Sequence, residues 1–319
     1  MIGRAKAMYV LGIDAGGTKT VCYLADAEGR ILGEARAGGA NLQAEGELGV
    51  EKVLHAVMDQ AARGRTLAID AICLGMAGVD READGAIVHG IMRRIGARAR
   101  TIVVNDALVA LVAGVGDAPG IVIICGTGSI AYGRNTPNEA ARSGGWGHLL
   151  GDEGSGYWIG CRALRAVARA ADGRGPATTL SARVLAHFGV ERPSDLIHEV
   201  YDRPLRHSVI AQVARAVQAA RDEGDEVATA ILEEAAHELI AAARSVTKRL
   251  RMEEDAFDFV VAGGVVTGVP WIADELRRRL PAIAPRGRVK RLELEPAVGA
   301  VHLAVAEARG GARIPAYVA

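Results

Sequence analysis

Two glycine-rich turns, each containing hydroxyl side chains, have the residue types that could bind phosphate. The first, Asp14–Thr20, reads DAGGTKT, and the second, Gly126–Ser129, reads GTGS. Backbone N–H groups in such turns can surround phosphate oxygens, and Lys19 adds a cation to the first turn. Asp14 could hold Mg²⁺ through water molecules, because this ion keeps much of its hydration shell. Two such turns indicate a phosphate chain clamped from both sides.

Neither turn fits a common nucleotide-binding motif. Gly12 and Gly17 have the spacing of a Walker A loop, but Thr18 precedes Lys19, and a strand is predicted to follow in place of a helix. The segment 126–131 matches G-x-G-x-x-A, but the Rossmann fingerprint also needs a helix at that point. We therefore expect phosphate binding at hairpin turns.

A carboxylate also stands where a strand is predicted to meet a helix. Asp106 follows the apolar run TIVVN and precedes ALVALVAG. It could be the general base that takes a proton from a hydroxyl in phosphoryl transfer. It could equally be the N-cap of the following helix, a position that Asp favours.

The loop 143–156 is the most unusual segment, because six of its residues from 144 to 156 are glycine. So much backbone freedom is costly unless the loop contacts something closely. Trp146 could stack on a sugar ring or fill a core, and Asp152 could accept hydrogen bonds from hydroxyls or cap a helix that starts near Ser155. His148 is expected to be a packed histidine or one that supports the site residues from behind, and not a catalyst.

Two further glycine sites allow a functional and a structural interpretation. The pair Gly263-Gly264 ends a predicted strand and could let a flat base or ribose lie on the backbone. Gly224 lies in a break between helical segments, where the favoured interpretation is a glycine that simply ends one helix before the next.

The elements that must position these residues form an α/β pattern that occurs twice. Strands are expected over 8–14, 20–26, 30–38, 68–78 and 101–106, with helices over about 46–63, 82–95 and 107–114. The second half begins with strands at 120–126 and 129–135 and a helical region over about 157–250 that breaks near 191–195. It ends with a strand at 256–264, a helix at 269–280, a strand at 288–294 and a helix at 296–309. This order predicts two α/β domains with the site in the cleft between them.

Composition excludes several classes of protein. The 319 residues include 38 basic and 38 acidic side chains, so the zero net charge argues against a nucleic-acid binder. No apolar stretch is long enough for a membrane span, and the N-terminus lacks a secretory pattern. The four cysteines are far apart in sequence and predict reduced thiols in a cytoplasmic protein.

Taken together, these motifs resemble the BadF/BadG/BcrA/BcrD ATPase family, and its N-acetylglucosamine kinase branch in particular. The matching segments are GIDAGGTKT, GGANLQ, NDALVAL, ICGTGSIAYG, GGWGHLLGDEGSGYWIG and VVAGGVV, in that order. The resemblance implies two actin-like (ribonuclease H-like) domains with a nucleotide and sugar cleft between them. The first would span 1–116, joined by the C-terminal helix at about 296–319. The second would span 117–295, with a helical insertion at about 157–250.

The resemblance also implies an ATP- and Mg²⁺-dependent kinase that phosphorylates the 6-hydroxyl of an amino sugar, with a homodimer expected. Asp106 would be the base and Asp14 the residue that holds Mg²⁺ through water. Phosphate and adenosine contacts would come from Gly16, Gly17, Thr18, Lys19, Thr127, Gly128, Gly224, Gly263 and Gly264. Sugar contacts would come from Asn41, Asn105, Asp106, Gly145, Trp146 and Asp152.

Specificity and two other functions stay open. Animal kinases of this branch have Asn directly after GTGS, where this chain has Ile130. N-acetylglucosamine, glucosamine and related sugars are therefore all possible acceptors. An ATPase that activates a partner reductase or dehydratase would need closely spaced cluster-binding cysteines, which the sequence lacks. A non-catalytic sugar sensor is the third alternative.

Overall fold

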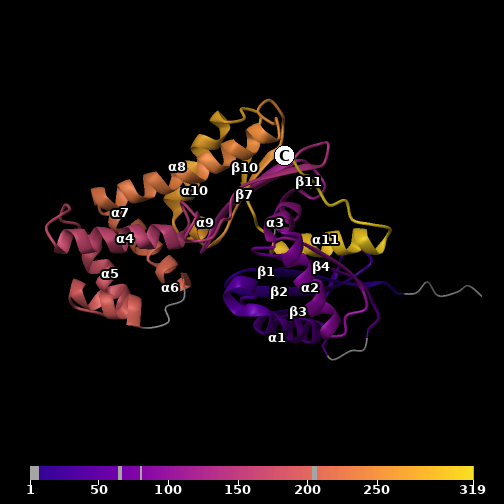
Figure 1. Cartoon of the computed structure of the whole chain (residues 1–319). Helices are drawn as coiled ribbons and strands as arrows, with labels where there is room; N and C mark the ends of the chain where they lie inside the picture. The colour runs from indigo at the N-terminus through magenta and orange to yellow at the C-terminus, as the bar shows by residue number, and fades with distance from the viewer. Residues whose placement is uncertain (1–6, 64–66, 80, 203–206, 319) are drawn as a thin grey trace, which may run out of the picture. The chain divides into compact units, whose positions relative to one another are not determined.

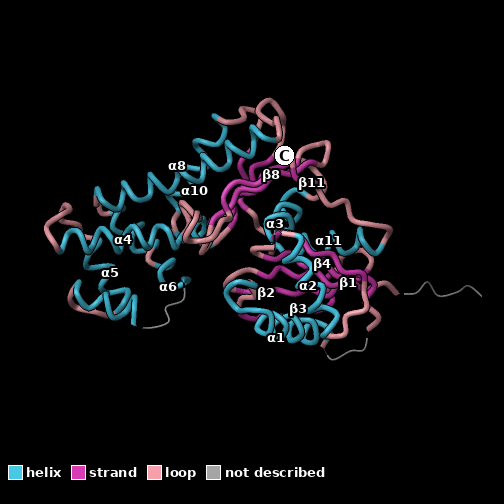
Figure 2. The backbone as a smooth tube through the Cα atoms, in the orientation of Figure 1, coloured by secondary structure: helices cyan, strands magenta, loops and turns pink. Residues whose placement is uncertain are grey.

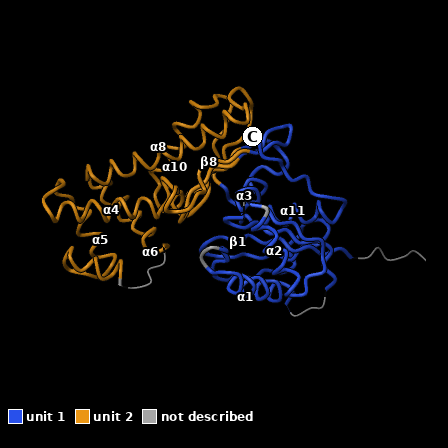
Figure 3. The backbone as a smooth tube through the Cα atoms, in the orientation of Figure 1, with its two compact units in different colours: residues 1–120, 133–140, 292–319 blue, residues 121–132, 141–291 orange. Residues whose placement is uncertain are grey.

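The computed structural model describes residues 7–63, 67–79, 81–202 and 207–318. The chain divides into two units (Figure 3): unit 1 comprises residues 1–120, 133–140 and 292–319, and unit 2 comprises residues 121–132 and 141–291. Both units contain strands and helices, and unit 2 has a long run of helices between its strands (Figures 1 and 2).

Unit 1 is built on a five-stranded sheet with the order β3-β2-β1-β4-β5. β1 and β2 form an antiparallel hairpin, whereas β1, β4 and β5 run parallel. The carboxyl ends of these three strands therefore lie at one edge, since Ala15 is in register with Met76 and Met76 with Asn105. The strands are β1 (Tyr9–Ala15), β2 (Lys19–Asp26), β3 (Ile31–Gly38), β4 (Ile69–Met76) and β5 (Arg100–Asn105).

Helices cover the two faces of this sheet differently. Leu11 and Ile13 of β1 face a core shared with α1 (Leu42–Ala62) and α2 (Glu82–Arg94). Gly12 faces the opposite side, where α11 (Pro296–Ala308) packs against β1 and against α3 (Asp106–Val115). Side chains alternate along a strand, so Asp14 belongs to the same face as Gly12.

Gly12 is the residue that lets α11 approach β1, and replacing it should destabilise the protein. A Cβ at position 12 would lie 2.3 Å from the backbone nitrogen of Val301 and 2.8 Å from the carbonyl oxygen of Ala297. We expect Gly12→Ala to lower the free energy of unfolding by about 1–3 kcal/mol, the usual cost of overpacking. Chemical denaturation would measure this loss.

Gly85→Ala is the matched control for that substitution. Gly85 lies within α2, and nothing is within 4 Å of a Cβ built there. Ala favours the helix over Gly, so this variant should be more stable than the parent by about 0.5–1 kcal/mol. Equal stabilities of the two variants would contradict the packing argument.

The second sheet has six strands in the order β10-β9-β6-β7-β8-β11. Its parallel pairs include β9 with β10, and β8 with β11, where Ala316 is opposite Glu139. The strands are β6 (Gly120–Cys125), β7 (Ser129–Arg134), β8 (Glu139–Gly144), β9 (Asp258–Ala262), β10 (Arg288–Arg291) and β11 (Ala316–Tyr317).

The expected long helical region consists of several helices that belong to unit 2. The longest, α8, ends it, and Asp225 caps α8 by accepting a hydrogen bond from the N–H of Ala228. The helical elements are α4 (Gly156–Ala171), α5 (Leu180–Phe188), η1 (Pro193–Asp195), η2 (His198–Asp202), α6 (His207–Gln212), α7 (Ala214–Asp222) and α8 (Glu226–Arg249). Helices α9 (Gly264–Gly268), α10 (Pro270–Arg279) and η3 (Leu280–Ala282) follow β9.

The α/β fold class and the βββαβαβα order of the first half are confirmed. The sequence did not predict β8, β11 or α9. The segment EAARSG of β8 has no apolar alternation, β11 has two residues, and α9 is a single turn rich in glycine.

The cysteines are free thiols. Cys22, Cys73 and Cys125 are buried, Cys161 is half-buried, and burial raises the pKa of Cys22 to about 12. Among the helices that the structure describes, none combines the length and the hydropathy needed to span a bilayer.

Candidate active site

The β1–β2 turn is held by backbone contacts at the carboxyl edge of the first sheet. The N–H of Gly16 donates to the carbonyl of Lys19 at 3.0 Å and closes the turn. The segment after β3 packs on it, since the N–H of Ala40 donates to the carbonyl of Gly16 at 3.0 Å. A Cβ at Gly39 would lie 2.3 Å from the carbonyl oxygen of Gly17, so only glycine fits there.

Asn41 lies at the same edge of unit 1. Its side-chain amide donates to the carbonyl of Ala77 at 3.4 Å, and the N–H of Ala77 donates to the carbonyl of Ala15 at 3.1 Å. The segment that precedes α1 is thereby connected to the ends of β4 and β1. The structure thus brings the predicted sugar contact Asn41 near the predicted phosphate turn.

The end of β5 and the start of α3 hold Asn105 and Asp106. Asn105 is the N-cap, because its side-chain oxygen accepts a hydrogen bond from the N–H of Ala107 at 2.8 Å. The alternative interpretation of Asp106 as the cap is therefore wrong. Asp106 is the first residue of α3 and is half-buried.

Asp14 and Asp106 interact electrostatically within unit 1. Asp14 is 7% exposed. Burial raises its pKa to about 7, and the negative charge of Asp106 adds to this effect. Lys19 acts in the opposite direction, and Glu295 raises the pKa of Asp14 a little further. A positive charge bound here would favour the ionised forms of both aspartates.

Lys19 has a partner that the sequence did not reveal. Its ammonium group lies 2.8 Å from a carboxylate oxygen of Glu295, the residue before α11. The other oxygen of that carboxylate accepts a hydrogen bond from Arg36 of β3 at 2.9 Å. Burial favours the neutral form of Glu295, but the hydrogen bonds from Lys19 and Arg36 outweigh it and lower its pKa. Nothing in the local sequence around Glu295 indicates this long-range contact.

In unit 2, the β6–β7 turn is joined to the start of α4. The N–H of Gly126 donates to the carbonyl of Gly128 at 2.9 Å and closes the turn. The N–H groups of Gly156 and Tyr157 donate to the carbonyls of Gly126 and Thr127, at 2.8 and 3.3 Å. The first amides of α4 are therefore occupied by this turn.

Asp152 also contacts the β6–β7 turn. Its carboxylate accepts a hydrogen bond from the N–H of Ser129 at 3.2 Å, and a Cβ at Gly128 would lie 2.9 Å from that carboxylate. Its backbone is left-handed, with φ of 61°, which Asp tolerates better than most residues. Burial raises the pKa of Asp152, and the hydrogen bond from Ser129 partly offsets this.

The cap of α4 is Ser155, whose hydroxyl accepts a hydrogen bond from the N–H of Trp158 at 3.1 Å. The interpretation of Asp152 as the side-chain cap is therefore wrong.

The glycine-rich loop places Gly145 against Ile130 and leaves Trp146 at the surface. Gly145 has φ of 71°, and a Cβ there would lie 2.8 Å from the end of the Ile130 side chain. Trp146 is 62% exposed, with the guanidinium of Arg142 4.7 Å from its ring centre. Ile130 and Trp146, with Ser129 and Glu153, line a cavity of about 310 Å³ in unit 2.

His148 is exposed, and its ring contacts the rings of His207 and Tyr157 at tilted and edge-on angles. The ring centres of His148 and His207 are 4.1 Å apart, and that of Tyr157 lies 5.3 Å from His148.

The remaining predicted glycines lie elsewhere in unit 2. A Cβ at Gly263, which has φ of 106°, would lie 2.2 Å from the carbonyl oxygen of Cys125, so β9 meets the end of β6 through this glycine. Gly264 begins α9. Gly224 has φ of 89° and separates α7 from α8, with nothing within 4 Å of a Cβ built there.

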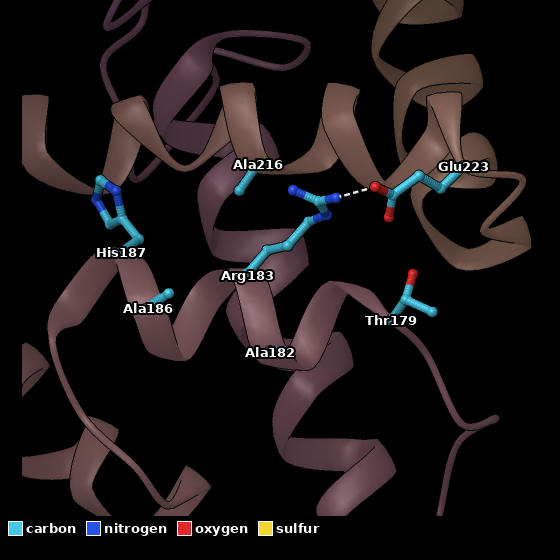
Figure 4. A pocket seen from close by; sticks show the side chains of 7 residues that line it. All are labelled: Thr179, Ala182, Arg183, Ala186, His187, Ala216 and Glu223. Carbon is cyan, nitrogen blue, oxygen red and sulfur yellow. Dashed lines mark hydrogen bonds and ion pairs between the residues drawn. The ribbon is translucent and has the colours of Figure 1, made fainter.

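A second cavity, of about 540 Å³, lies between α5 and α7 in unit 2 (Figure 4). Arg183 and Glu223 form an ion pair in it, and the alanine side chains that line it come from both helices. None of the predicted site residues lines this larger cavity, so we attach no catalytic role to it. The lining residues are Thr179, Ala182, Arg183, Ala186, His187, Ala216 and Glu223.

The chain is structurally similar to sugar kinases with the actin-like fold. A solved structure from Chromobacterium violaceum, provisionally assigned as an N-acetylglucosamine kinase, superposes with a TM-score of 0.73 at 28% identity, covering 92% of this chain and 98% of that one. The chain belongs to the BadF/BadG/BcrA/BcrD ATPase family, whose model matches residues 11–304. The resemblance read from the motifs is thus confirmed.

Two relatives match nearly the whole chain. The N-acetylmuramic acid/N-acetylglucosamine kinase of Clostridium acetobutylicum is 38% identical over 302 residues, which cover 94% of this chain and 99% of that protein. The N-acetyl-D-glucosamine kinase of Dictyostelium discoideum is 35% identical over 309 residues, which cover 92% of this chain and 97% of that protein.

Proposed function

We propose that this chain is an ATP-dependent kinase that phosphorylates the 6-hydroxyl of N-acetylglucosamine or a related hexosamine. The observation that carries the proposal is the pair of aspartates at the carboxyl edge of the first sheet, where the electrostatic effect of Asp106 reaches the buried Asp14. The two full-length relatives support it, since both are named as amino-sugar kinases.

In this proposal Asp106 is the general base. It accepts the proton of the attacking sugar hydroxyl as the oxygen bonds to the terminal phosphorus and the bond from that phosphorus to ADP breaks. The role suits a half-buried carboxylate that begins a helix at the end of a parallel strand. Because Asn105 caps α3, the base is not needed to start the helix.

The residues of the β1–β2 turn suit a magnesium nucleotide. Bound Mg²⁺ and ATP would supply the phosphoryl group and the positive charge that offsets charge building up during transfer. Asp14 suits a position near the cation. Burial and the charge of Asp106 raise its pKa to about 7, and a nearby positive charge would lower that pKa and favour the ionised carboxylate.

The turns and the loop would divide the remaining contacts. Gly16, Gly17, Thr18, Lys19, Thr127 and Gly128 would bind phosphate oxygens, and Gly224, Gly263 and Gly264 would flank adenosine. Asn41, Asn105, Gly145, Trp146 and Asp152 would hold the sugar. Asp152 suits this role, because its carboxylate is oriented by the hydrogen bond from the N–H of Ser129. We propose that the enzyme works in the cytoplasm as a homodimer, as the resemblance implies.

Sugar-dependent release of ADP tests the activity. The acceptors should include N-acetylglucosamine, glucosamine, N-acetylmuramic acid and glucose, because apolar Ile130 lies against Gly145 at the position where animal kinases of the branch have Asn. We expect an amino sugar to give the highest kcat/KM, with the phosphate on its 6-hydroxyl. A rate of ATP hydrolysis that no sugar changes would favour the ATPase-activator alternative. Sugar binding without ATP turnover would favour the sensor.

A further inference from the structure

We propose that Glu295 is a positioning residue that holds the ammonium group of Lys19 at the β1–β2 turn, ready for the phosphates of the nucleotide. The inference rests on the proposed function, which gives Lys19 its phosphate-binding role. It assigns a role to Glu295, which lies 276 residues from Lys19 in sequence.

The contact belongs to a chain of charged side chains in unit 1. Glu295 accepts hydrogen bonds from Lys19 at 2.8 Å and from Arg36 at 2.9 Å, one on each carboxylate oxygen. Arg36 in turn donates to Glu34 at 2.6 Å. Glu295 is thus fixed on both oxygens, which orients the oxygen that meets Lys19.

The backbone on both sides of this contact is also fixed. Lys19 and Arg36 lie on neighbouring strands of one sheet, where Val21 is opposite Arg36. Glu295 directly precedes α11, which packs against β1 at Gly12 and against α3. The anchor is therefore held in place by the packing of α11, and Lys19 reaches it with a long side chain from the first residue of β2.

An anchor of this kind has a physical advantage for binding. The Lys19 side chain is 55% exposed, and a long exposed lysine loses rotamer freedom when it meets a ligand. A lysine already ordered by Glu295 loses less of that freedom on binding, so the site is pre-organised. The opposite effect would follow if the Glu295 carboxylate competed with phosphate for Lys19, because ATP binding would then be weaker. The doubly held carboxylate favours the first effect, and the direction of one affinity change distinguishes them.

The test is the affinity for Mg·ATP, measured by calorimetry, in a double-mutant cycle of Glu295→Gln and Lys19→Met. We expect Glu295→Gln to raise Kd and KM for ATP about three- to tenfold, with KM for the sugar and kcat at saturating ATP within about twofold of the parent. In the Lys19→Met background the same change should have no further effect on Kd.

Glu51→Gln is the matched control. Glu51 has the same side-chain exposure as Glu295, 27%, and forms an ion pair with Arg94 at 2.6 Å on α1 of the same unit. It should leave the affinity for ATP unchanged. Should Glu295→Gln prove unstable in thermal denaturation, Arg36→Gln removes the second hold on the same carboxylate, and its Kd for ATP should also rise.

Three results would overturn the inference: an unchanged Kd in Glu295→Gln, a tighter Kd, or equal losses in the parent and Lys19→Met backgrounds. Failure of the proposed function looks different, because the parent protein itself would then show no ATP binding or no sugar-dependent turnover.

Discussion

Asp106→Asn should lower kcat by about 10²–10⁴-fold, the usual contribution of a positioned general base. Asn has nearly the same shape as Asp but cannot accept the proton of the sugar hydroxyl. Because Asn105 caps α3, the substitution should leave the helix and the affinity for ATP largely intact. Steady-state ADP release and Kd for Mg·ATP, measured on the same preparation, would show this separation.

Asp117→Asn serves as the control for that variant. Asp117 is exposed and follows the other end of α3, so the same chemical change there should not alter turnover. If Asp106→Asn keeps full activity, Asp106 is not the base and the proposed mechanism is wrong.

Asp14→Asn should change how stability depends on pH. The pKa of Asp14 is raised from 3.8 to about 7 in the folded protein, so the carboxyl stabilises the fold only while it is protonated. This stabilisation is complete below 3.8 and is lost as pH rises through about 7. Without Mg²⁺, we therefore expect the variant to gain stability relative to the parent by about 3 kcal/mol between pH 5 and pH 8, at ~1.4 kcal/mol per pH unit.

Urea denaturation of parent and variant in EDTA at both pH values would measure this gain. Asp225→Asn provides the comparison. Burial favours neutral Asp225, but hydrogen bonds from Ala228, Thr178 and Thr179 outweigh it and lower its pKa. Its carboxyl is ionised in folded and unfolded chains alike from pH 5 to pH 8, so the cost of Asp225→Asn should be flat over that range. A similarly flat difference for Asp14→Asn would contradict the raised pKa.

The sequence was sufficient to predict the hairpins and the elements around Asp14 and Asp106. Glycine and hydroxyl residues between apolar runs define the turns locally, and the period of two along β1 follows from the same runs. The family resemblance implied that two aspartates 92 residues apart in sequence (106 − 14) share a site. The parallel register of β1, β4 and β5 in the structure puts the ends of β1 and β5 at one edge.

Contacts that depend on tertiary structure could not be predicted. The pairing of Lys19 with Glu295 depends on where α11 packs on the sheet, and no local sequence pattern specifies that position. Capping was also misjudged, because adjacent residues with similar propensity compete for the position: Asn105 and Ser155 are the caps, where Asp106 and Asp152 were considered. The sequence carries the residue types at each helix start, but backbone geometry decides between neighbours.

The close fit of Gly12 against Val301 also bears on how the protein is made. β1 leaves the ribosome before α11, which covers one face of it and begins 281 residues after β1 ends (296 − 15). At a translation rate of about 5–20 residues per second, β1 waits roughly 15–60 s for that cover. During this interval the side chains on that face of the nascent sheet lack the helix that covers them, and exposed apolar surface of this kind favours aggregation.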